Sequence, residues 1–267
     1  MKRGKGRFPI FLPVEQSREL ETHGQGWEGE TVEESIELCR FQTIEPLFRK
    51  YLPAQGKILE AGCGLGRWVF YLKQQGYDVT GIDLSERAVS LAKQFDPHAP
   101  IQVGDVLHTD FADQTFDAVI SLGVVEHFEE GPHRPFREAK RVLKPDGLFL
   151  IAVPLQNLFR RACIYQLRRL RLIEWKLRSA SVCFEEYHYT RRHIIALLEE
   201  SQFEVIETAY DDFRYPKNMA MYADSRLFRS KKKWELNLFG KFLDRGLRMI
   251  SPWVNAAGIL CVCRKKQ

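Results

Sequence analysis

The sequence predicts an α/β fold with a doubly wound, mostly parallel sheet and helices on both faces. From residue 57 onward, short apolar runs alternate with stretches in which apolar residues recur with the period of a helix. Apolar runs such as "FLIAV" at residues 149–153 are typical of strands that helices cover on both faces. A glycine-rich turn, "GCGLG" at residues 62–66, joins the first such run to a helical stretch, which is a place where open α/β sheets bind ligands.

The expected strands and helices follow in chain order. Five strands alternate with helical stretches in the first part of the chain, at residues 57–61, 78–82, 101–103, 116–122 and 147–153. Two closing strands are expected at residues 203–208 and 258–264. Helices are expected at residues 31–52, where Pro53 and Gly56 end the pattern, at 86–95 after the capping residue Ser85, and at 132–143 before the turn "KPDG".

Length and composition indicate a folded chain with one large domain. The 267 residues are 45% hydrophobic, and we expect an N-terminal helical segment at residues 1–56 and a main domain at residues 57–267. No apolar run reaches the ~18 residues that would span a bilayer, and the apolar part of the basic N-terminus is too short for a signal peptide. We therefore expect a cytoplasmic location. The six cysteines form no CxxC pair, so we expect reduced, structural thiols.

The glycine turn disfavours two common ligands. A dinucleotide fingerprint would require glycine at position 67, where the sequence has Arg67, and no Gly-Lys-Ser/Thr follows to make a phosphate loop. Asp83 follows the second strand, where a carboxylate can accept two hydrogen bonds from a ribose. Asp105 follows the third strand and is placed to accept a hydrogen bond from an adenine amino group. These residues indicate an adenosine-containing ligand.

Five motifs in order carry a family resemblance: "ILEAGCGLGR", "GIDLS", "GDVLHTDF", "FDAVISLGVVEHF" and "KPDGLFLIAVP". Together they resemble class I S-adenosylmethionine-dependent methyltransferases, and most of all the broad group that contains quinone-biosynthesis O-methyltransferases. The resemblance covers residues 57–154, and more loosely residues 187–208 and 258–265. It implies a Rossmann-like, seven-stranded sheet with an antiparallel last strand, and S-adenosyl-L-methionine as the cofactor.

The resemblance also implies cofactor contacts, residue by residue. The methionine end would lie against the glycine turn, which makes room for it, the ribose at Asp83 and the adenine at Asp105. The complete set is Glu60, Gly62, Gly64, Gly66, Asp83, Leu84, Asp105, Val106, Leu122 and Gly123. Glu60 would hold the cationic amine, and Leu84 and Val106 would cover the faces of the ring. A plainer interpretation stays open, because glycines shape turns and aspartates cap helices without any ligand.

His127 in "GVVEHF" is the candidate catalytic residue. It follows the fourth strand, and a histidine can remove the proton of a hydroxyl acceptor. Alternatively, it only positions the acceptor. His188 is a second candidate for the acceptor pocket. The residues after the fourth strand read Ser-Leu-Gly-Val rather than Asn/Asp-Pro-Pro-Tyr, which favours oxygen or carbon acceptors, and no metal is expected.

Two insertions, at about residues 155–186 and 211–257, are expected to form an acceptor lid. Aromatic and methionine side chains in the second insertion would line an apolar pocket or simply form core: Phe213, Tyr215, Met219, Met221 and Tyr222.

The net charge of +5 is unevenly distributed. Residues 156–178 contain seven basic residues and one acid, and residues 226–250 contain eight basic residues and two acids, which leaves the rest of the chain net acidic. On a helix, one side of the first segment would be apolar (Phe159, Cys163, Leu170, Ile173, Leu177) and the other basic (Arg160, Arg161, Arg168, Arg171, Arg178). Such a helix would lie on an anionic membrane surface or pack as a lid, and residues 226–250 offer a second contact.

The sequence therefore predicts methyl transfer from S-adenosylmethionine to a small-molecule acceptor. We expect a hydroxyl oxygen of an apolar, lipid-like or glycan-related compound. The alternatives are an RNA methyltransferase, which only the basic segments favour, and a catalytically inactive S-adenosylmethionine-binding protein. Nucleic acid is not an expected partner, an anionic membrane is a candidate contact, and the oligomeric state is left open.

Overall fold

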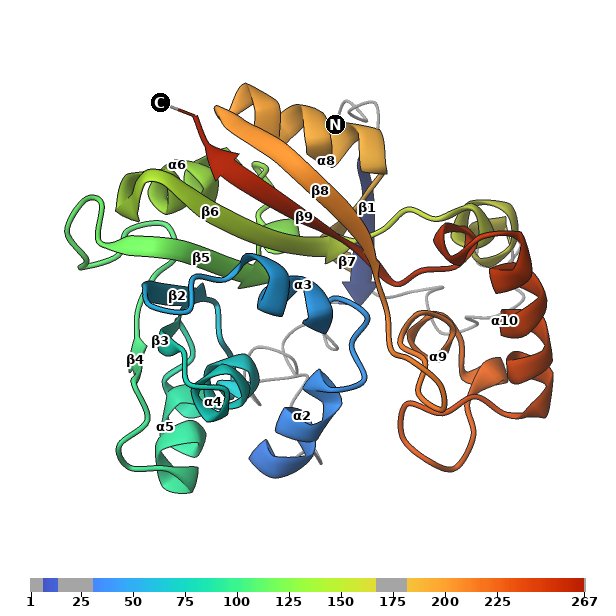
Figure 1. Ribbon diagram of the computed structural model, residues 1–267. Helices are drawn as coiled ribbons and strands as arrows, with labels where there is room; N and C mark the ends of the chain where they lie inside the picture. Colours follow the sequence, from blue (N-terminus) through green and yellow to red (C-terminus); the bar gives the residue numbers. More distant parts are fainter. Residues whose placement is uncertain (1–6, 14–30, 167–181, 267) are drawn as a thin grey trace.

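The computed structural model describes residues 7–13, 31–166 and 182–266, and its centre is a seven-stranded sheet (Figure 1). The strand order is β4-β3-β2-β5-β6-β9-β8. The strands are β2 (Lys57–Ala61), β3 (Asp78–Asp83), β4 (Ile101–Val103), β5 (Phe116–Leu122), β6 (Leu143–Pro154), β8 (Phe203–Asp211) and β9 (Gly258–Lys265). β4, β3, β2, β5 and β6 pair in parallel, whereas β9 is antiparallel to both β6 and β8. The predicted sheet, including its antiparallel last strand, is confirmed.

Helices cover both faces of this sheet, as predicted. One face packs against α2 (Val32–Cys39), α3 (Glu45–Tyr51), α4 (Arg67–Gln74) and α5 (Glu86–Phe95), and the other against α6 (His133–Val142) and α8 (Arg191–Glu200). Neighbouring residues of β2 show the alternation, because Ile58 packs in the cluster that contains Trp68 whereas Leu59 packs with Phe136. Both faces of the parallel strands are therefore buried.

Residues 31–52 form two helices, so the prediction of one continuous helix is wrong. α2 and α3 are separated by residues 40–44, which bind the end of β8. Gln42 Nε2 donates to the Asp211 carboxylate at 3.2 Å, and Thr43 Oγ1 donates to the Tyr210 carbonyl oxygen at 2.8 Å. The backbone pairing changes as well, because the Thr43 N–H donates to the Asp212 carbonyl oxygen at 2.9 Å. The Gln42 N–H donates only three residues back, to the Cys39 carbonyl oxygen at 3.2 Å. Pairing with a distant segment interrupts the helix, which the periodicity of a single segment does not reveal.

The N-terminal segment also contains a strand that the helical interpretation of residues 1–56 missed. β1 (Arg7–Pro13) pairs antiparallel with β7 (Val182–Tyr189) in a separate two-stranded sheet. Arg7 lies opposite Tyr189 and its guanidinium stacks 4.4 Å from the ring centre of Tyr187. Because the partner strand lies far along the chain, no local pattern around β1 signals this pairing.

The second insertion forms a helical lobe beside the sheet, at the right of Figure 1. It contains α9 (Ala220–Asp224), α10 (Leu238–Ile250) and three short helical turns: η2 (Arg160–Ile164) from the first insertion, η4 (Arg226–Phe228) and η5 (Pro252–Val254). Its own core consists of Phe159, Ile164, Met221, Phe228 and Leu236. Phe213 and Met221 are buried, in agreement with the core interpretation, whereas Tyr215 is 82% exposed and lines no buried pocket.

The buried position of Arg160 contradicts the prediction that it lies on the basic side of an amphipathic helix. It was expected on a solvent- or lipid-facing side, but it is buried and its Nε lies 2.8 Å from Asp224 Oδ1. Its Nη1 donates to the carbonyl oxygens of Leu155 and Ala257. Cys163, expected on the apolar side, is exposed, and residues 168–178 lie outside the described residues. Arg160 therefore joins the two insertions instead of contacting a membrane.

The cysteines of β9 and the lengths of the helices bear on two further expectations. Cys261 and Cys263 lie buried on β9 as free thiols, and burial raises the pKa of Cys261 to about 12, so both are structural as predicted. Across the described residues, no helix has the length and apolar character needed to cross a membrane.

Candidate active site

The glycine turn lies between the end of β2 and the start of α4. Gly62, Gly64 and Gly66 all have positive φ, at 84°, 54° and 75°, which L side chains rarely adopt. A Cβ on Gly62 would lie 2.3 Å from Val124 Cγ2, and one on Gly66 would lie 2.2 Å from Ile101 Cδ1. At these two positions the space that a side chain would need is filled by the protein, so both glycines shape the turn and let neighbouring strands approach.

Glu60 is the second-last residue of β2 and has the properties of a cation-binding residue. It is 3% exposed, and its Oε2 has no hydrogen-bond partner. Burial raises the pKa of Glu60 to about 8, although the nearby Arg67 acts in the opposite direction. A buried carboxyl group with a free oxygen is costly unless a ligand satisfies it. The site therefore fits a ligand with an ammonium group, as predicted for S-adenosylmethionine.

Asp83, at the end of β3, connects the first two strand ends. Its Oδ2 accepts from the Gly64 N–H at 2.7 Å and its Oδ1 accepts from the Ser85 N–H at 2.9 Å. Each carboxylate oxygen keeps a second lone pair, which a ribose hydroxyl can use. The next residue, Leu84, is 72% exposed, an unusual position for a large apolar side chain. A planar ring stacked on Leu84 would cover it.

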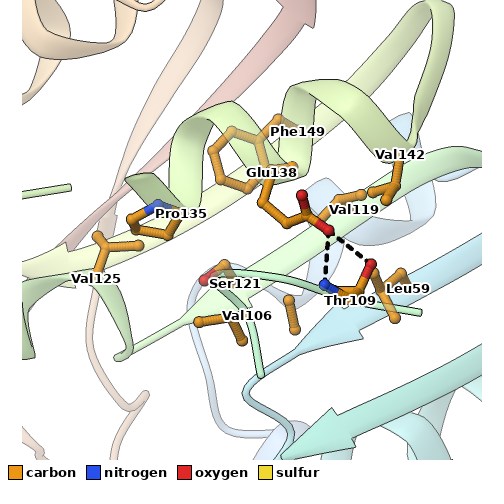
Figure 2. Close-up of a pocket in the computed structure, with 12 residues that line it drawn as sticks. Leu59, Val106, Thr109, Val119, Ser121, Val125, Pro135, Glu138, Val142 and Phe149 are labelled. Carbon is orange, nitrogen blue, oxygen red and sulfur yellow. Dashed lines mark hydrogen bonds between the residues drawn. The ribbon is translucent and has the colours of Figure 1, made fainter. Parts of the chain in front are cut away.

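Asp105 and Val106 lie in the loop after β4. Figure 2 shows Val106 and the contact between Thr109 of this loop and Glu138 of α6. Asp105 Oδ1 accepts from the Leu107 N–H at 2.8 Å, and its side chain is exposed. The loop is fixed at Thr109, whose N–H and hydroxyl both donate to Glu138 Oε1, at 2.7 and 2.8 Å. Val106 lines an apolar pocket between the sheet and α6. This pocket adjoins the predicted adenine contact.

Glu138 is a residue that the sequence did not signal as important for the site. Burial acts to raise its pKa, but Arg141 and the two Thr109 donors outweigh burial and lower the pKa to about 2. Arg141 Nη2 lies 2.6 Å from Glu138 Oε1. The charged carboxylate therefore links α6 to the loop that carries Asp105.

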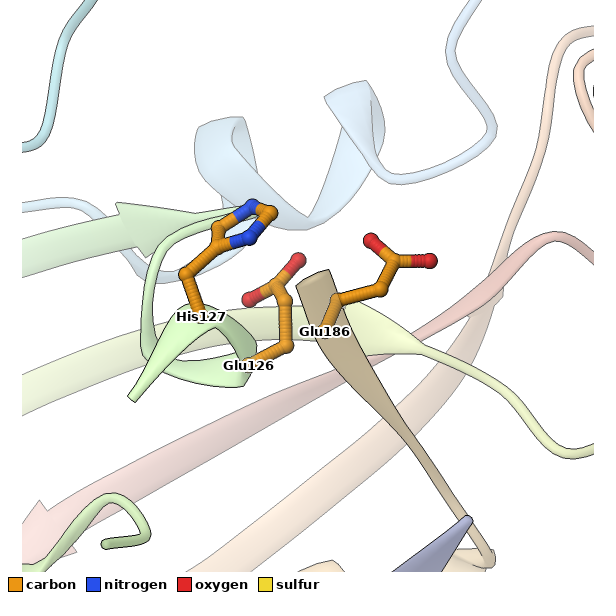
Figure 3. Close-up of side chains that lie close together, drawn as sticks. All are labelled: Glu126, His127 and Glu186. Atoms are coloured by element: carbon orange, nitrogen blue, oxygen red, sulfur yellow. The ribbon is translucent and has the colours of Figure 1, made fainter. Parts of the chain in front are cut away.

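β5 ends at Leu122, and Gly123 follows it directly. The short helical turn η1 (Val125–His127) comes next and carries Glu126 and His127 (Figure 3). Gly123 has φ of 72°, and its N–H donates to the Ala152 carbonyl oxygen at 3.0 Å. β5 pairs in parallel with β2, so its carboxyl end meets the glycine turn at one edge of the sheet. The close approach of Val124 to Gly62 shows the two segments in contact. His127 thus lies at the edge that carries the cofactor residues.

The protonation of His127 follows from one hydrogen bond. Its Nδ1 lies 2.9 Å from the Glu185 carbonyl oxygen on β7. A carbonyl oxygen only accepts, so Nδ1 carries the proton, and Nε2 of the neutral ring holds a free lone pair. Burial acts to lower the pKa of His127, but Glu126, the Glu185 carbonyl and Glu186 outweigh it and raise the pKa. His127 is therefore a stronger base than an ordinary histidine.

Carboxyl groups surround this histidine. Glu126 is 2% exposed, its Oε2 has no partner, and burial raises its pKa to about 8. Glu186 and His127 offer ligand atoms which, with that of Glu126, lie within 4.8 Å of one another (Figure 3). This spacing is compatible with a divalent cation, although Nδ1 of His127 and Oε1 of Glu186 already have hydrogen-bond partners. The expectation of no metal stays a prediction.

His188 is buried behind the carboxylates. Its Nε2 lies 2.7 Å from Glu186 Oε1, and its Nδ1 lies 2.7 Å from the Tyr165 hydroxyl. It therefore supports Glu186, and both of its ring nitrogens have partners. Sequence reasoning missed Glu186, although the run "FEEYHY" at residues 184–189 placed two acids beside a histidine that was already a candidate.

Comparison with known proteins agrees with this geometry. Residues 59–151 match a family described as a methyltransferase domain. The chain is 36% identical over 110 residues to 2-methyl-6-phytyl-1,4-hydroquinone methyltransferase of Synechocystis sp., covering 38% of this chain and 33% of that protein. It is 35% identical over 103 residues to phosphoethanolamine N-methyltransferase 3 of Arabidopsis thaliana, covering 36% of this chain and 20% of that protein. It is 36% identical over 114 residues to a probable tRNA methyltransferase 9B of Mus musculus, covering 40% of this chain and 24% of that protein.

The matched part of the chain spans a third or less of the length of these three relatives. Solved structures match a larger share of this chain than these relatives do. Their sequence identity is low, so they show the fold alone. A Pyrococcus horikoshii protein gives a TM-score of 0.59 at 21% identity, covering 92% of this chain and 99% of that one. The 1,6-didemethyltoxoflavin-N1-methyltransferase of Burkholderia thailandensis, crystallised with S-adenosylhomocysteine, gives 0.54 at 14% identity, covering 100% and 99%. Residues 59–151 therefore match a methyltransferase domain, and the fold around them is shared with a methyltransferase that was crystallised with S-adenosylhomocysteine.

Proposed function

We propose that the protein transfers a methyl group from S-adenosylmethionine to a hydroxyl oxygen of a small, apolar acceptor of lipid-like or glycan-related chemistry. The observation that carries this proposal is the Nδ1 contact of His127 with the Glu185 carbonyl oxygen, which leaves Nε2 free to accept a proton. A hydroxyl needs such a base to become a good nucleophile, whereas a neutral amine does not.

Each residue has a role in this proposal. Bound S-adenosylmethionine supplies an electrophilic methyl group. Glu60 would bind the amine of the cofactor, Asp83 the ribose and Asp105 the adenine, while His127 takes the hydroxyl proton of the acceptor. Glu186 stabilises the protonated imidazole, since its own pKa is lowered and it acts to raise the pKa of His127.

The relatives support a methyl acceptor without selecting one. Their names include a phytyl hydroquinone, phosphoethanolamine and tRNA. The proposal of an oxygen acceptor rests on His127. The proposal of an apolar acceptor rests on the hydroquinone relative. An RNA acceptor and an inactive cofactor-binding protein are the competing outcomes.

The test uses purified protein, S-adenosylmethionine labelled in its methyl group, and separate lipid, aqueous-metabolite and RNA fractions of a cell extract. We expect label in the lipid or metabolite fraction, and loss of that label in the His127→Gln variant. Label in RNA would replace this proposal with the RNA methyltransferase. Binding of S-adenosylmethionine with no transfer to any fraction would indicate a non-catalytic binder.

A further inference from the structure

Helix α10 exposes large apolar side chains on the side that faces away from the protein. Leu238 is 87% exposed, Phe242 81% and Met249 82%, and Phe239 and Ile250 are also exposed. At about 100° per residue, the first three lie within an arc of about 40° on the helix surface. Five large apolar residues on one 13-residue helix form a continuous strip, which we call the outer face of α10.

The opposite side of the same helix already has its partners. Leu243 and Leu247 pack on the lobe core, and a Cβ added to Gly240 would lie 3.0 Å from the Phe228 carbonyl oxygen. A surface helix normally pairs one apolar face with a polar one. Because the inner face of α10 accounts for its packing, the outer face is a second apolar surface.

Nearby residues extend this surface at its N-terminal end. Leu227 is 59% exposed, and its carbonyl oxygen accepts a hydrogen bond of 2.7 Å from Asn237 Nδ2, which holds it next to the start of α10. The ring of Phe239 stacks 6.0 Å from that of Phe228. These two contacts, of Asn237 with Leu227 and of Phe239 with Phe228, hold the start of α10 against the rest of the lobe.

The charges around the outer face are cationic. Residues 226–250 contain two acids, and both have cationic partners: Glu235 lies 4.0 Å from Lys241, and Asp244 lies 2.9 Å from Arg248. The exposed basic residues of this segment are Arg226, Arg229, Lys231, Lys232, Lys233 and Arg245. Eight basic residues against two acids give this segment a net charge of +6, so the apolar strip belongs to a strongly basic segment.

We propose that the outer face of α10 docks on an anionic lipid bilayer, with its apolar side chains among the acyl chains and its lysines and arginines at the headgroups. This pattern, aromatic and aliphatic side chains exposed on a segment of net positive charge, complements a negatively charged membrane. A protein partner or a second copy of this chain would bury the apolar strip but would not by itself require the cationic border. The inference is independent of the acceptor chemistry proposed above.

The experiment is flotation of the full chain with vesicles of phosphatidylcholine alone or with about 30% phosphatidylglycerol, the anionic component. We expect binding to the anionic vesicles at low salt, release as salt rises, and little binding to neutral vesicles. The variant Leu238→Ser/Phe242→Ser removes apolar contacts from a surface that carries no core packing. It should fold normally by circular dichroism and lose anionic-vesicle binding at least about tenfold, since each apolar side chain contributes separately.

A matched pair of charge variants tests the cationic border. Lys231→Gln/Lys232→Gln/Lys233→Gln should weaken binding roughly 100-fold, at about fivefold per charge. Lys73→Gln/Lys93→Gln/Lys266→Gln removes the same charge from exposed lysines outside the lobe and should bind like the original chain. Label transfer and S-adenosylmethionine affinity in solution, which need no vesicle, report separately on the proposed function.

Three results would overturn the proposal. One is equal binding to neutral and anionic vesicles, or binding to neither. Another is equal loss of binding in the two triple-lysine variants, because net charge rather than α10 would then be responsible. The third is a concentration-dependent dimer that Leu238→Ser/Phe242→Ser abolishes, which would assign the outer face to a second copy of the chain.

Discussion

The region proposed to bind the cofactor and the region proposed to bind the acceptor are each stabilised by contacts of a different range in the sequence. On the cofactor side, each strand is followed at once by the residues it presents, and Asp83 binds the N–H groups of Gly64 and Ser85. On the acceptor side, His127 contacts Glu185 on β7, and Arg160 contacts Asp224 and Ala257. A short motif can therefore specify the first arrangement, whereas the second exists only after distant segments have packed.

This difference predicts which property each substitution changes. Changes on the cofactor side should affect cofactor affinity, and changes on the acceptor side should affect turnover or the stability of the lobe. The largest expected effect is on turnover.

His127→Ala should lower turnover by ~10²–10⁴-fold, because the acceptor loses its base, and leave cofactor affinity nearly unchanged. Since the pKa of His127 is raised and the base must be unprotonated, the rate of the original enzyme should increase with pH and reach half its maximum above pH 6.5. Steady-state kinetics and calorimetry measure both quantities. A small loss of rate with a flat pH profile would make His127 a positioning residue.

Arg160→Met should destabilise the lobe by about 3–5 kcal/mol, because Asp224 is left buried without its cation. The neighbouring Arg161 is exposed, so Arg161→Met is the matched control and should have little effect. The double variant Arg160→Met/Asp224→Leu should recover much of the stability. Denaturant unfolding checks all three, and equal effects at positions 160 and 161 would contradict the buried link between the insertions.

Gly62→Ala should cost roughly 2–4 kcal/mol, from an unfavourable φ and from overlap with Val124. Gly76→Ala has a similar positive φ of 90° but nothing within 4 Å of the new Cβ, so it should cost only about 1 kcal/mol. Adding Val124→Ala to Gly62→Ala should restore part of the loss. If the two glycine variants are equally stable, packing around the turn is not what requires Gly62.

Asp83→Asn should weaken S-adenosylmethionine binding by ~1.5–3 kcal/mol, because a charged acceptor for the ribose is lost. Asparagine is preferable to alanine here, since its side-chain oxygen can retain one of the two backbone contacts. Calorimetry gives the affinity, and thermal unfolding shows whether the turn is intact. Unchanged affinity in a folded variant would remove the ribose assignment.

The smallest expected effect is a pH dependence that originates at Glu60. The folded pKa of about 8 lies above the usual value, so the contribution of this group to stability is complete at low pH and is lost as pH rises through about 8. A bound ammonium group reverses that loss. The increase in melting temperature caused by S-adenosylmethionine should therefore grow between about pH 5 and 7. Glu60→Gln should remove this growth, and a growth that persists in the variant would exclude Glu60 as the amine site.

The sequence was sufficient to predict the seven strands, because each has its own apolar run and its own turn. It also predicted the Ser85 cap and the positions of Asp83 and His127 at strand ends, which depend on neighbours in the chain. It failed where distant residues decide the outcome. Thr43 binds Tyr210 and Asp212 at the end of β8, between the two helices, and Arg160 binds Asp224 and is buried.

The glycine turn shows a subtler limit. Its motif predicted positive φ correctly, but the reason inferred for the glycines was space for the cofactor. At Gly62 and Gly66 the missing side chains instead admit Val124 and Ile101. A pattern of residue types records that a side chain must be absent, and only the surroundings in space say which neighbour excludes it.

The pairing of β1 with β7 has a consequence for the order in which the molecule is made. Arg7 meets Tyr189, so about 180 residues must be synthesised before β1 has its partner, on the order of 10–40 s at ribosomal rates. By that time the strands from β2 to β6 are complete. β1 can therefore pair only after the segments from β2 to β6 have been synthesised, and β7, which carries Glu185 and Glu186 to His127, gains its partner from a strand made well before it.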